Sequence, residues 1–184
     1  GSEHTFGGKQ MDLSVHCVHK QSASPFFNAA NPRYGVLGFV YEVSETESDP
    51  FLALIEDHLP SGSSRRLAEA TNISAFTGPL DFGLLPGGEP VNQYFTYEGS
   101  LTTPPCSEVV DWYVAAKPKK VSAEQLRKFK VAIGTTGGNF RPPQELHGRI
   151  IEGCEEWTVG GAGRERPGFI ALLVMGAALS LHLR

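Results

Sequence analysis

The sequence predicts an α+β fold dominated by strands, in which a mostly antiparallel central sheet is accompanied by a few short helices. Two segments supply the strand signal. Apolar and polar residues alternate over Met11–His19, and a period of two is typical of a strand. Tyr34–Val43 is rich in β-branched and aromatic residues, which are enriched in strands. Helical spacing is confined to two short segments, one after Asp49 and one after Ser122.

Both expected helices have start signals. Asp49-Pro50 opens the first, in which apolar residues recur at helical spacing until Pro60 ends the segment. Ser122–Gln125 reads S-A-E-Q, a capping box in which the serine and glutamine side chains each bind a backbone N–H at the helix start. The second helix is therefore expected to run to about Ile133.

Two further strands, Tyr94–Tyr97 and Val109–Ala115, are expected to pair around a turn at Gly99–Pro105. Ser61–Arg66 is polar, and Phe82–Pro90 is rich in glycine and proline, so both segments are expected to be loops.

Length and composition fit one globular domain. The chain has 184 residues, of which 40% are apolar and 20% are charged, and this length suits a single domain with a real core. The formal net charge is -4 and the chain contains no run of Lys and Arg, which argues against a nucleic-acid partner. Nothing in the sequence indicates an oligomeric state.

Two features bear on the redox compartment. The cysteines are Cys17, Cys106 and Cys154, and their odd number means that at least one is free or has its partner outside this chain. Asn72 opens an N-I-S glycosylation sequon, which has meaning only if the protein enters the secretory pathway.

The end of the chain divides the sequence into a domain over residues 1–153, a linker over 154–168 and an apolar tail over 169–184. The linker holds a small-residue cluster, Gly160–Gly163, and then a charged stretch that ends at Arg166. This order of small residues, polar stretch and apolar run is typical of a glycolipid (GPI) anchor signal, whose tail is removed. A membrane-spanning helix and a C-terminal helix packed on the domain are the alternatives. The expected location is therefore the cell surface, reached through the secretory pathway.

Two histidines on the first strand are candidate metal ligands. His16 and His19 are three positions apart, so a strand period of two places them on opposite faces, where they cannot bind one ion together. A catalytic zinc needs three protein ligands and an open position for water, and His16 could supply one of the three. The alternative is a hydrogen-bonded core histidine.

A rigid turn supplies the second candidate. Ser100–Pro105 reads S-L-T-T-P-P, in which two prolines fix φ and remove two backbone donors. The two threonines ahead of the prolines offer hydroxyls and backbone N–H groups that suit a small anion, whereas the alternative is an ordinary rigid turn.

Five segments, in a fixed order, carry a family resemblance. They are G-S-E-H-T at Gly1–Thr5, V-H-C-V-H at Val15–His19, Y-E-G-S-L-T-T-P-P-C at Tyr97–Cys106, S-A-E-Q-L-R-K-F at Ser122–Phe129 and N-F-R-P-P-Q at Asn139–Gln144. They resemble successive signature segments of the α-class carbonic anhydrases of the secreted or membrane-bound type, zinc enzymes that hydrate carbon dioxide. The resemblance runs to about Arg149 and implies part of that family's fold.

The resemblance implies roles for specific residues. His16 matches the third ligand of a zinc ion (Zn2+), and the family carries the other two histidines, and a proton-shuttle histidine, upstream of this segment. Thr102 matches the threonine that accepts the proton of zinc-bound hydroxide in a hydrogen bond and donates its own to a buried carboxylate, which Glu3 matches. Such a relay orients the hydroxide toward the substrate.

Three further residues match supporting positions. His4 and Tyr97 match a buried pair behind the site. Ser14 stands where the family usually has a glutamate that orients the third zinc ligand, and loss of such a partner typically lowers metal affinity or activity about 10–100-fold.

The implied substrates are carbon dioxide and bicarbonate. The Thr102 N–H matches an anion contact, and the Thr103 hydroxyl matches a bicarbonate contact. Four residues match the apolar wall where carbon dioxide lies: Val18, Val36, Leu101 and Trp112. Zinc lowers the pKa of bound water to about 7, so hydroxide is available at neutral pH to attack carbon dioxide.

Two expectations and two alternatives complete the interpretation. Cys106 is expected to form a disulfide with an upstream cysteine, because the secreted and membrane-bound members bridge that position. The chain alone is expected to be inactive, because one histidine cannot supply a catalytic zinc site. Two other interpretations stay open: a catalytically inactive, carbonic-anhydrase-related surface module that binds partners, and an unrelated β-rich binding domain.

Overall fold

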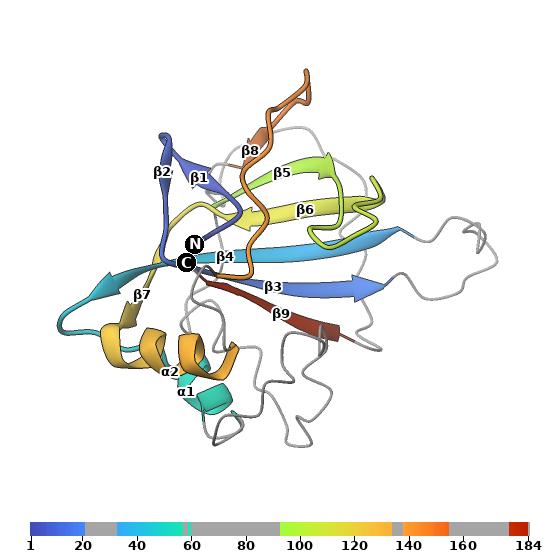
Figure 1. Cartoon of the computed structure of the whole chain (residues 1–184). Helices are drawn as coiled ribbons and strands as arrows, with labels where there is room; N and C mark the ends of the chain where they lie inside the picture. The colour runs from blue at the N-terminus through green and yellow to red at the C-terminus, as the bar shows by residue number, and fades with distance from the viewer. Residues whose placement is uncertain (21–32, 57–58, 60–92, 134–137, 155–176, 184) are drawn as a thin grey trace, which may run out of the picture.

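The structure, a computed structural model, describes residues 1–20, 33–56, 59, 93–133, 138–154 and 177–183. Within these residues the chain forms nine strands and two helices (Figure 1). The strands are β1 (Thr5–Phe6), β2 (Lys9–Gln10), β3 (Leu13–Lys20), β4 (Tyr34–Ser44), β5 (Tyr94–Gly99), β6 (Val110–Ala115), β7 (Lys119–Ser122), β8 (Glu152–Cys154) and β9 (Ala177–Leu183). The helices are α1 (Pro50–Glu56) and α2 (Ala123–Ile133).

A seven-stranded sheet organises the molecule, in the order β8-β5-β6-β4-β3-β9, with β7 paired to β4 (Figure 1). The pairs β3–β4, β3–β9, β5–β6 and β5–β8 are antiparallel, whereas β4 runs parallel to β6 and β7. The strand-dominated α+β fold with a mostly antiparallel sheet is therefore confirmed, and the two parallel pairs make the sheet mixed.

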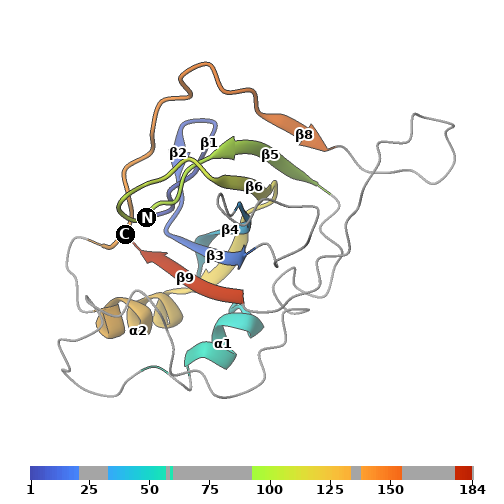
Figure 2. The ribbon, with the colours of Figure 1, turned by 90° about the vertical axis from the view of Figure 1, so that its right-hand side faces the viewer.

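Strand β3 contributes to two apolar clusters because its residues alternate between the faces of the sheet. Leu13 and Val15 lie in the larger cluster, on the face that α1 and α2 cover (Figure 2). Val18 packs instead against a smaller cluster around Trp112. His16 is in register with Val18 and therefore belongs to this second face, away from the helices.

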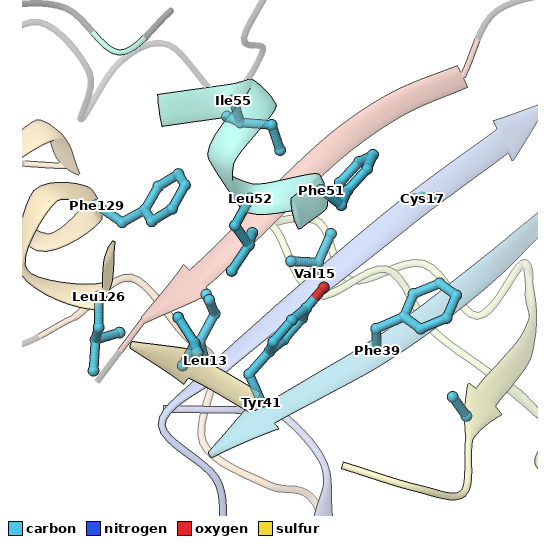
Figure 3. Packing of buried hydrophobic residues seen from close by; sticks show 12 residues of the cluster. Leu13, Val15, Cys17, Phe39, Tyr41, Phe51, Leu52, Ile55, Leu126 and Phe129 are labelled. Carbon is cyan, nitrogen blue, oxygen red and sulfur yellow. The ribbon is translucent and has the colours of Figure 1, made fainter. Parts of the chain in front are cut away.

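The larger cluster anchors α1 on the sheet. Figure 3 shows Phe51, Leu52 and Ile55 of this helix in one cluster with Val15 and Tyr41 of the strands. All five side chains are at most 1% exposed. Burying one such apolar side chain contributes about 1.5–3 kcal/mol, so this packing is what holds the short helix in place.

The capping box predicted before α2 is confirmed, and it also ties the two helices together. The Ser122 hydroxyl accepts the Gln125 N–H at 3.1 Å, and Gln125 Oε1 accepts the Ser122 N–H at 3.3 Å. The Gln125 side chain also accepts the Asp49 N–H and donates to the Asp49 carbonyl, both at 2.9 Å. Asp49 Oδ1 in turn accepts the Leu52 N–H at 2.9 Å and caps α1.

The four predicted strands are confirmed as β3, β4, β5 and β6, with ends that agree within two residues. The strands β5 and β6 pair as expected, and α2 ends at Ile133 as expected. The first predicted helix is confirmed as α1, and its expected end at Pro60 lies outside the described residues, as do the loops expected at Ser61–Arg66 and Phe82–Pro90.

Only the last part of the apolar tail lies within the described residues. There Ala177–Leu183 forms strand β9, which pairs antiparallel with β3 along its whole length. The described part of the tail is therefore a strand at the edge of the sheet. No helix among the described residues is long and apolar enough to cross a membrane.

Candidate functional site

A short hairpin at the start of the chain positions Glu3. Gly7 and Gly8 connect β1 to β2 with φ of 57° and 77°, the left-handed values that a two-residue hairpin loop needs at both positions. Ser2 then closes the segment on itself: its N–H donates to the Met11 carbonyl at 2.9 Å, and its hydroxyl accepts the Met11 N–H at 3.0 Å. The segment that carries Glu3 is therefore fixed beside the start of β3.

The Glu3 carboxyl lies at the centre of the candidate site. Its side chain is only 4% exposed, and Oε2 is 3.6 Å from His16 Nδ1. Oε1 accepts the Arg141 N–H at 2.6 Å, and the Thr102 side chain also hydrogen-bonds the carboxyl. Burial raises the pKa of Glu3 from 4.5 to about 7, although the hydrogen bonds from Arg141 and Thr102 oppose the shift.

Two further rings, those of Trp112 and His4, pack against the His16 side chain. His16 is 1% exposed. Its ring meets the Trp112 ring edge to face, with centroids 4.8 Å apart, and the His4 ring with centroids 5.8 Å apart. By strand alternation, His19 belongs to the opposite face of β3. His16 is therefore the histidine of this strand that lies beside Glu3.

The buried pair predicted behind the site is present. His4 Nε2 and the Tyr97 hydroxyl lie 2.8 Å apart, and the Tyr97 ring stacks on Trp112 with an interplanar angle of 8°. Burial lowers the pKa of His4 from 6.5 to about 4, so its imidazole is neutral at physiological pH. A neutral, packed histidine next to His16 is consistent with a supporting role.

The loop after β5 presents Thr102 to Glu3. A Cβ on Gly99 would lie 2.7 Å from Tyr97 Cε2, so only glycine allows this close approach at the loop's start. The Ser100 carbonyl accepts Trp112 Nε1–H at 3.1 Å, and the Leu101 N–H donates to the Ser107 carbonyl at 3.0 Å. The loop is thus held at both ends.

The remaining residues of this loop are placed as follows. Pro104-Pro105 is joined by a cis peptide bond, and Cys106 has a φ of 58°. The Cys106 N–H donates to the Thr103 carbonyl at 2.9 Å. Thr102 is half-buried and Thr103 is exposed.

The four residues predicted to form the apolar wall come together in one cluster. Val36 and Trp112 are 1% and 3% exposed and belong to the core of this cluster, against which Val18 and Leu101 pack. That these side chains line a cavity together with His16 stays a prediction. The apolar cluster does lie on the His16 face of the sheet, where the prediction requires it.

Ser14 is the one predicted supporting residue that makes no hydrogen bond through its side chain in the described part of the chain. It is fully buried, and its Oγ has no partner there. The hydroxyl therefore does not orient His16 by a hydrogen bond. Ser14 shares its face with His16 by strand alternation, so its position alone agrees with the expectation.

The residues that the structure describes contain no group of three or more His, Cys, Asp or Glu side chains that could hold a metal ion. His16 fits one ligand position of a zinc site, because it is a buried imidazole beside a carboxyl. The described residues therefore suit part of such a site, and the other ligands would have to come from elsewhere.

The cysteine and glycosylation predictions stay untested. Cys106 is a free, half-buried thiol, and Cys17 is a free thiol inside the core whose pKa burial raises to about 12. A disulfide from Cys106 to an upstream cysteine stays a prediction. The Cys154 side chain and the sequon at Asn72 lie outside what the structure describes.

Sequence reasoning assigned no role to Arg141. The contact that links this residue to Glu3 uses its backbone N–H, which every residue except proline carries, so residue type could not have signalled it. The only available signal was its place in the segment N-F-R-P-P-Q.

Comparison with known proteins agrees with this geometry. A family model described as eukaryotic-type carbonic anhydrase matches residues 1–154. Carbonic anhydrase 7 of Homo sapiens is 36% identical over an alignment of 172 residues, and the match covers 83% of this chain and 58% of that protein. Alpha carbonic anhydrase 8 of Arabidopsis thaliana is 33% identical, over 82% of this chain and 34% of that protein.

Solved structures give the same picture. The α-carbonic anhydrase of Thermovibrio ammonificans, solved with the inhibitor sulfanilamide, superposes with a TM-score of 0.62 at 33% identity, over 82% of this chain and 57% of that one. A halotolerant carbonic anhydrase of Dunaliella salina superposes with a TM-score of 0.60 at 29% identity, over 83% and 56%. The chain thus spans only part of the length of the relatives that it matches.

Proposed function

The chain belongs to the eukaryotic-type carbonic anhydrase family, and on this premise we propose that it forms the C-terminal part of a zinc-dependent enzyme that hydrates carbon dioxide reversibly to bicarbonate and a proton. The observation that carries the proposal is the contact between Glu3 and Thr102, which lie far apart in the sequence, at a carboxyl 3.6 Å from His16. A zinc ion bound by His16 and by ligands from outside this chain would supply a hydroxide nucleophile at neutral pH.

The chain's own residues would orient the reactants. Because the Thr102 hydroxyl donates its hydrogen to Glu3, its oxygen is left to accept a hydrogen bond from the substrate side. This fixes the direction in which the nucleophile's own hydrogen points. The Thr102 N–H and the exposed Thr103 hydroxyl would then bind bicarbonate.

An apolar side to the site suits carbon dioxide, which carries no charge and makes only weak hydrogen bonds. Val18, Val36 and Leu101 pack together with Trp112 on the His16 face. Such a surface binds a nonpolar substrate and excludes competing water.

A second function has one observation in its favour. Ser14 leaves a buried hydroxyl without a hydrogen-bond partner among the described residues, beside the only predicted zinc ligand. A site with weakened support for its metal is also what an inactive, carbonic-anhydrase-related surface module would show. The identity of the upstream ligand residues separates the two functions.

The proposed function is tested by expressing the protein that carries this chain together with the sequence upstream of it. We expect stoichiometric zinc and stopped-flow carbon dioxide hydration well above background. Thr102→Ala should reduce the rate about 10²–10³-fold, by analogy with loss of one group that orients a transition state, and His16→Ala should abolish most of it. A zinc-loaded protein with no hydration activity would instead favour the surface module.

We also propose that the protein reaches the cell surface, held by a glycolipid anchor. The sequon at Asn72 and the order of small, charged and apolar residues from Gly160 onward support this. Removal of the tail as an anchor signal would also remove β9, so a tail that stays paired with β3 excludes the anchor. Treating cells with a phosphatidylinositol-specific phospholipase should release the protein, and its retention with an intact C-terminus would refute the anchor.

A further inference from the structure

Arg141 contacts two parts of the candidate site that are separate in the sequence. Its backbone N–H donates to Glu3 Oε1 at 2.6 Å. Its guanidinium donates from Nη1 to Ser100 Oγ at 3.1 Å and from Nη2 to Gln144 Oε1 at 3.3 Å. One residue therefore holds the carboxyl with its backbone and the loop that carries Thr102 with its side chain.

The Ser100 contact matters because of where Ser100 lies. It is two residues before Thr102, and its carbonyl already accepts the Trp112 indole N–H at 3.1 Å. With the Arg141 guanidinium on its hydroxyl, Ser100 is held from two sides. A shift of this residue would move Thr102 relative to Glu3.

The residues that follow Arg141 restrict its backbone in a way that suits these contacts. Pro142 and Pro143 follow directly, and a residue before proline is restricted to extended conformations. The Arg141 N–H is therefore kept aimed at Glu3 with little freedom to turn away. The planar guanidinium offers several N–H groups in a fixed fork, so it can serve Ser100 and Gln144 at the same time, which a lysine ammonium does less well.

We propose that Arg141 is a positioning residue for the reaction proposed above: it fixes the loop from Ser100 to Thr103 against Glu3, so that the Thr102 hydroxyl keeps its orientation. The inference rests on the proposed function. The positioning role differs from a purely structural one because it requires Arg141 to affect the turnover step more than substrate binding.

The first test uses the chain itself and needs no activity. Trp157→Phe leaves Trp112 as the single tryptophan, whose emission reports on the Ser100 contact. Arg141→Met should increase amide hydrogen exchange at Leu101 and Cys106 about 5–10-fold, the effect of losing one or two hydrogen bonds, and should shift the Trp112 emission.

Two matched variants control this first test. Arg141→Lys should restore part of the protection from exchange. Arg127→Met removes an exposed arginine that pairs with Glu124 on α2, far from the loop, and should change neither the exchange nor the emission. Unchanged exchange in Arg141→Met would overturn the inference.

The second test uses the protein that carries this chain with its upstream sequence. Arg141→Met should lower kcat for carbon dioxide hydration about 10-fold or more with little change in KM, and Arg141→Lys should recover part of kcat. An inactive wild type refutes the proposed function and the positioning role with it, whatever the exchange data show. An active wild type whose kcat is unaffected by Arg141→Met, despite faster exchange, refutes the positioning role alone.

Discussion

Replacing Glu3 by Gln should make the chain more stable at neutral and alkaline pH. The pKa of Glu3 is about 7 in the fold against 4.5 in a free side chain, and burial is the main cause. A shift of this size corresponds to about 3–4 kcal/mol, at about 1.4 kcal/mol for each pH unit. Gln keeps the shape of the side chain but cannot ionise, so it removes this cost.

The sign follows from proton linkage. An acid whose folded pKa is raised contributes stability below its unfolded pKa, and that stability is lost as the pH rises through the folded pKa. The wild type should therefore lose stability between about pH 4.5 and 7. Between pH 5 and 8, Glu3 alone should lower the free energy of unfolding by about 2–3 kcal/mol.

The assay is urea unfolding of the metal-free chain at several pH values, followed by circular dichroism. The difference in free energy of unfolding between Glu3→Gln and wild type should increase by about 2–3 kcal/mol from pH 5 to pH 8. Glu145→Gln, a change at an exposed carboxyl, should follow the wild type at every pH. Parallel curves for Glu3→Gln and wild type would show that Glu3 ionises normally and would refute the reasoning.

Three further predictions concern other parts of the chain. Gln125→Ala should lower the free energy of unfolding in urea by about 2–4 kcal/mol, because it leaves the buried Asp49 N–H without its partner and removes one of the two hydrogen bonds to the Asp49 carbonyl, which also accepts the Ala53 N–H; a near-neutral effect would contradict the clamp between the helices. Gly99→Ala should lower the free energy of unfolding by about 1–3 kcal/mol and shift the Trp112 emission, since the new Cβ would clash with the Tyr97 ring. An unchanged emission spectrum and an unchanged urea midpoint would show that the ring can move away. Mass spectrometry of the protein with its upstream sequence should find Cys106 in a disulfide with an upstream cysteine, and a reduced Cys106 would disprove it.

The elements that the sequence predicted correctly are those with local signals. The strands β3 and β4 and the two helices show their own periodicity or caps, so reading a short window was enough. The hairpin of β1 and β2 was missed although Gly7-Gly8 is a turn signal, because its strands are only two residues long.

Other elements depend on distant partners. The strand β7 reads K-K-V-S, which has no apolar alternation, and it forms because β4 offers a free edge beside it. The tail was expected to be an anchor or a helix, and its uniform apolar run gave no period from which the strand β9 could be read.

The candidate site shows the same division between what can be read from a motif and what cannot. The motifs, taken in order, predicted that Glu3, Thr102 and His16 belong to one site and that His4 pairs with Tyr97, and the structure brings these residues together. Two of the contacts that hold this arrangement use backbone groups, the Arg141 N–H and the Ser100 carbonyl. Backbone groups leave no mark on residue type, so only the folded chain reveals them.

The energetics of Glu3 give an argument for function that does not depend on family resemblance. A buried carboxyl whose pKa is raised to about 7 lowers the stability of the chain at physiological pH, so packing alone would favour an uncharged residue there. The chain nevertheless supplies donors for it, from Thr102 and from the Arg141 N–H. Perturbed groups with specific partners are concentrated at functional sites. Glu3→Gln should therefore have opposite effects in an enzyme, raising stability while lowering hydration activity, whereas in a surface-binding module it should raise stability without loss of binding.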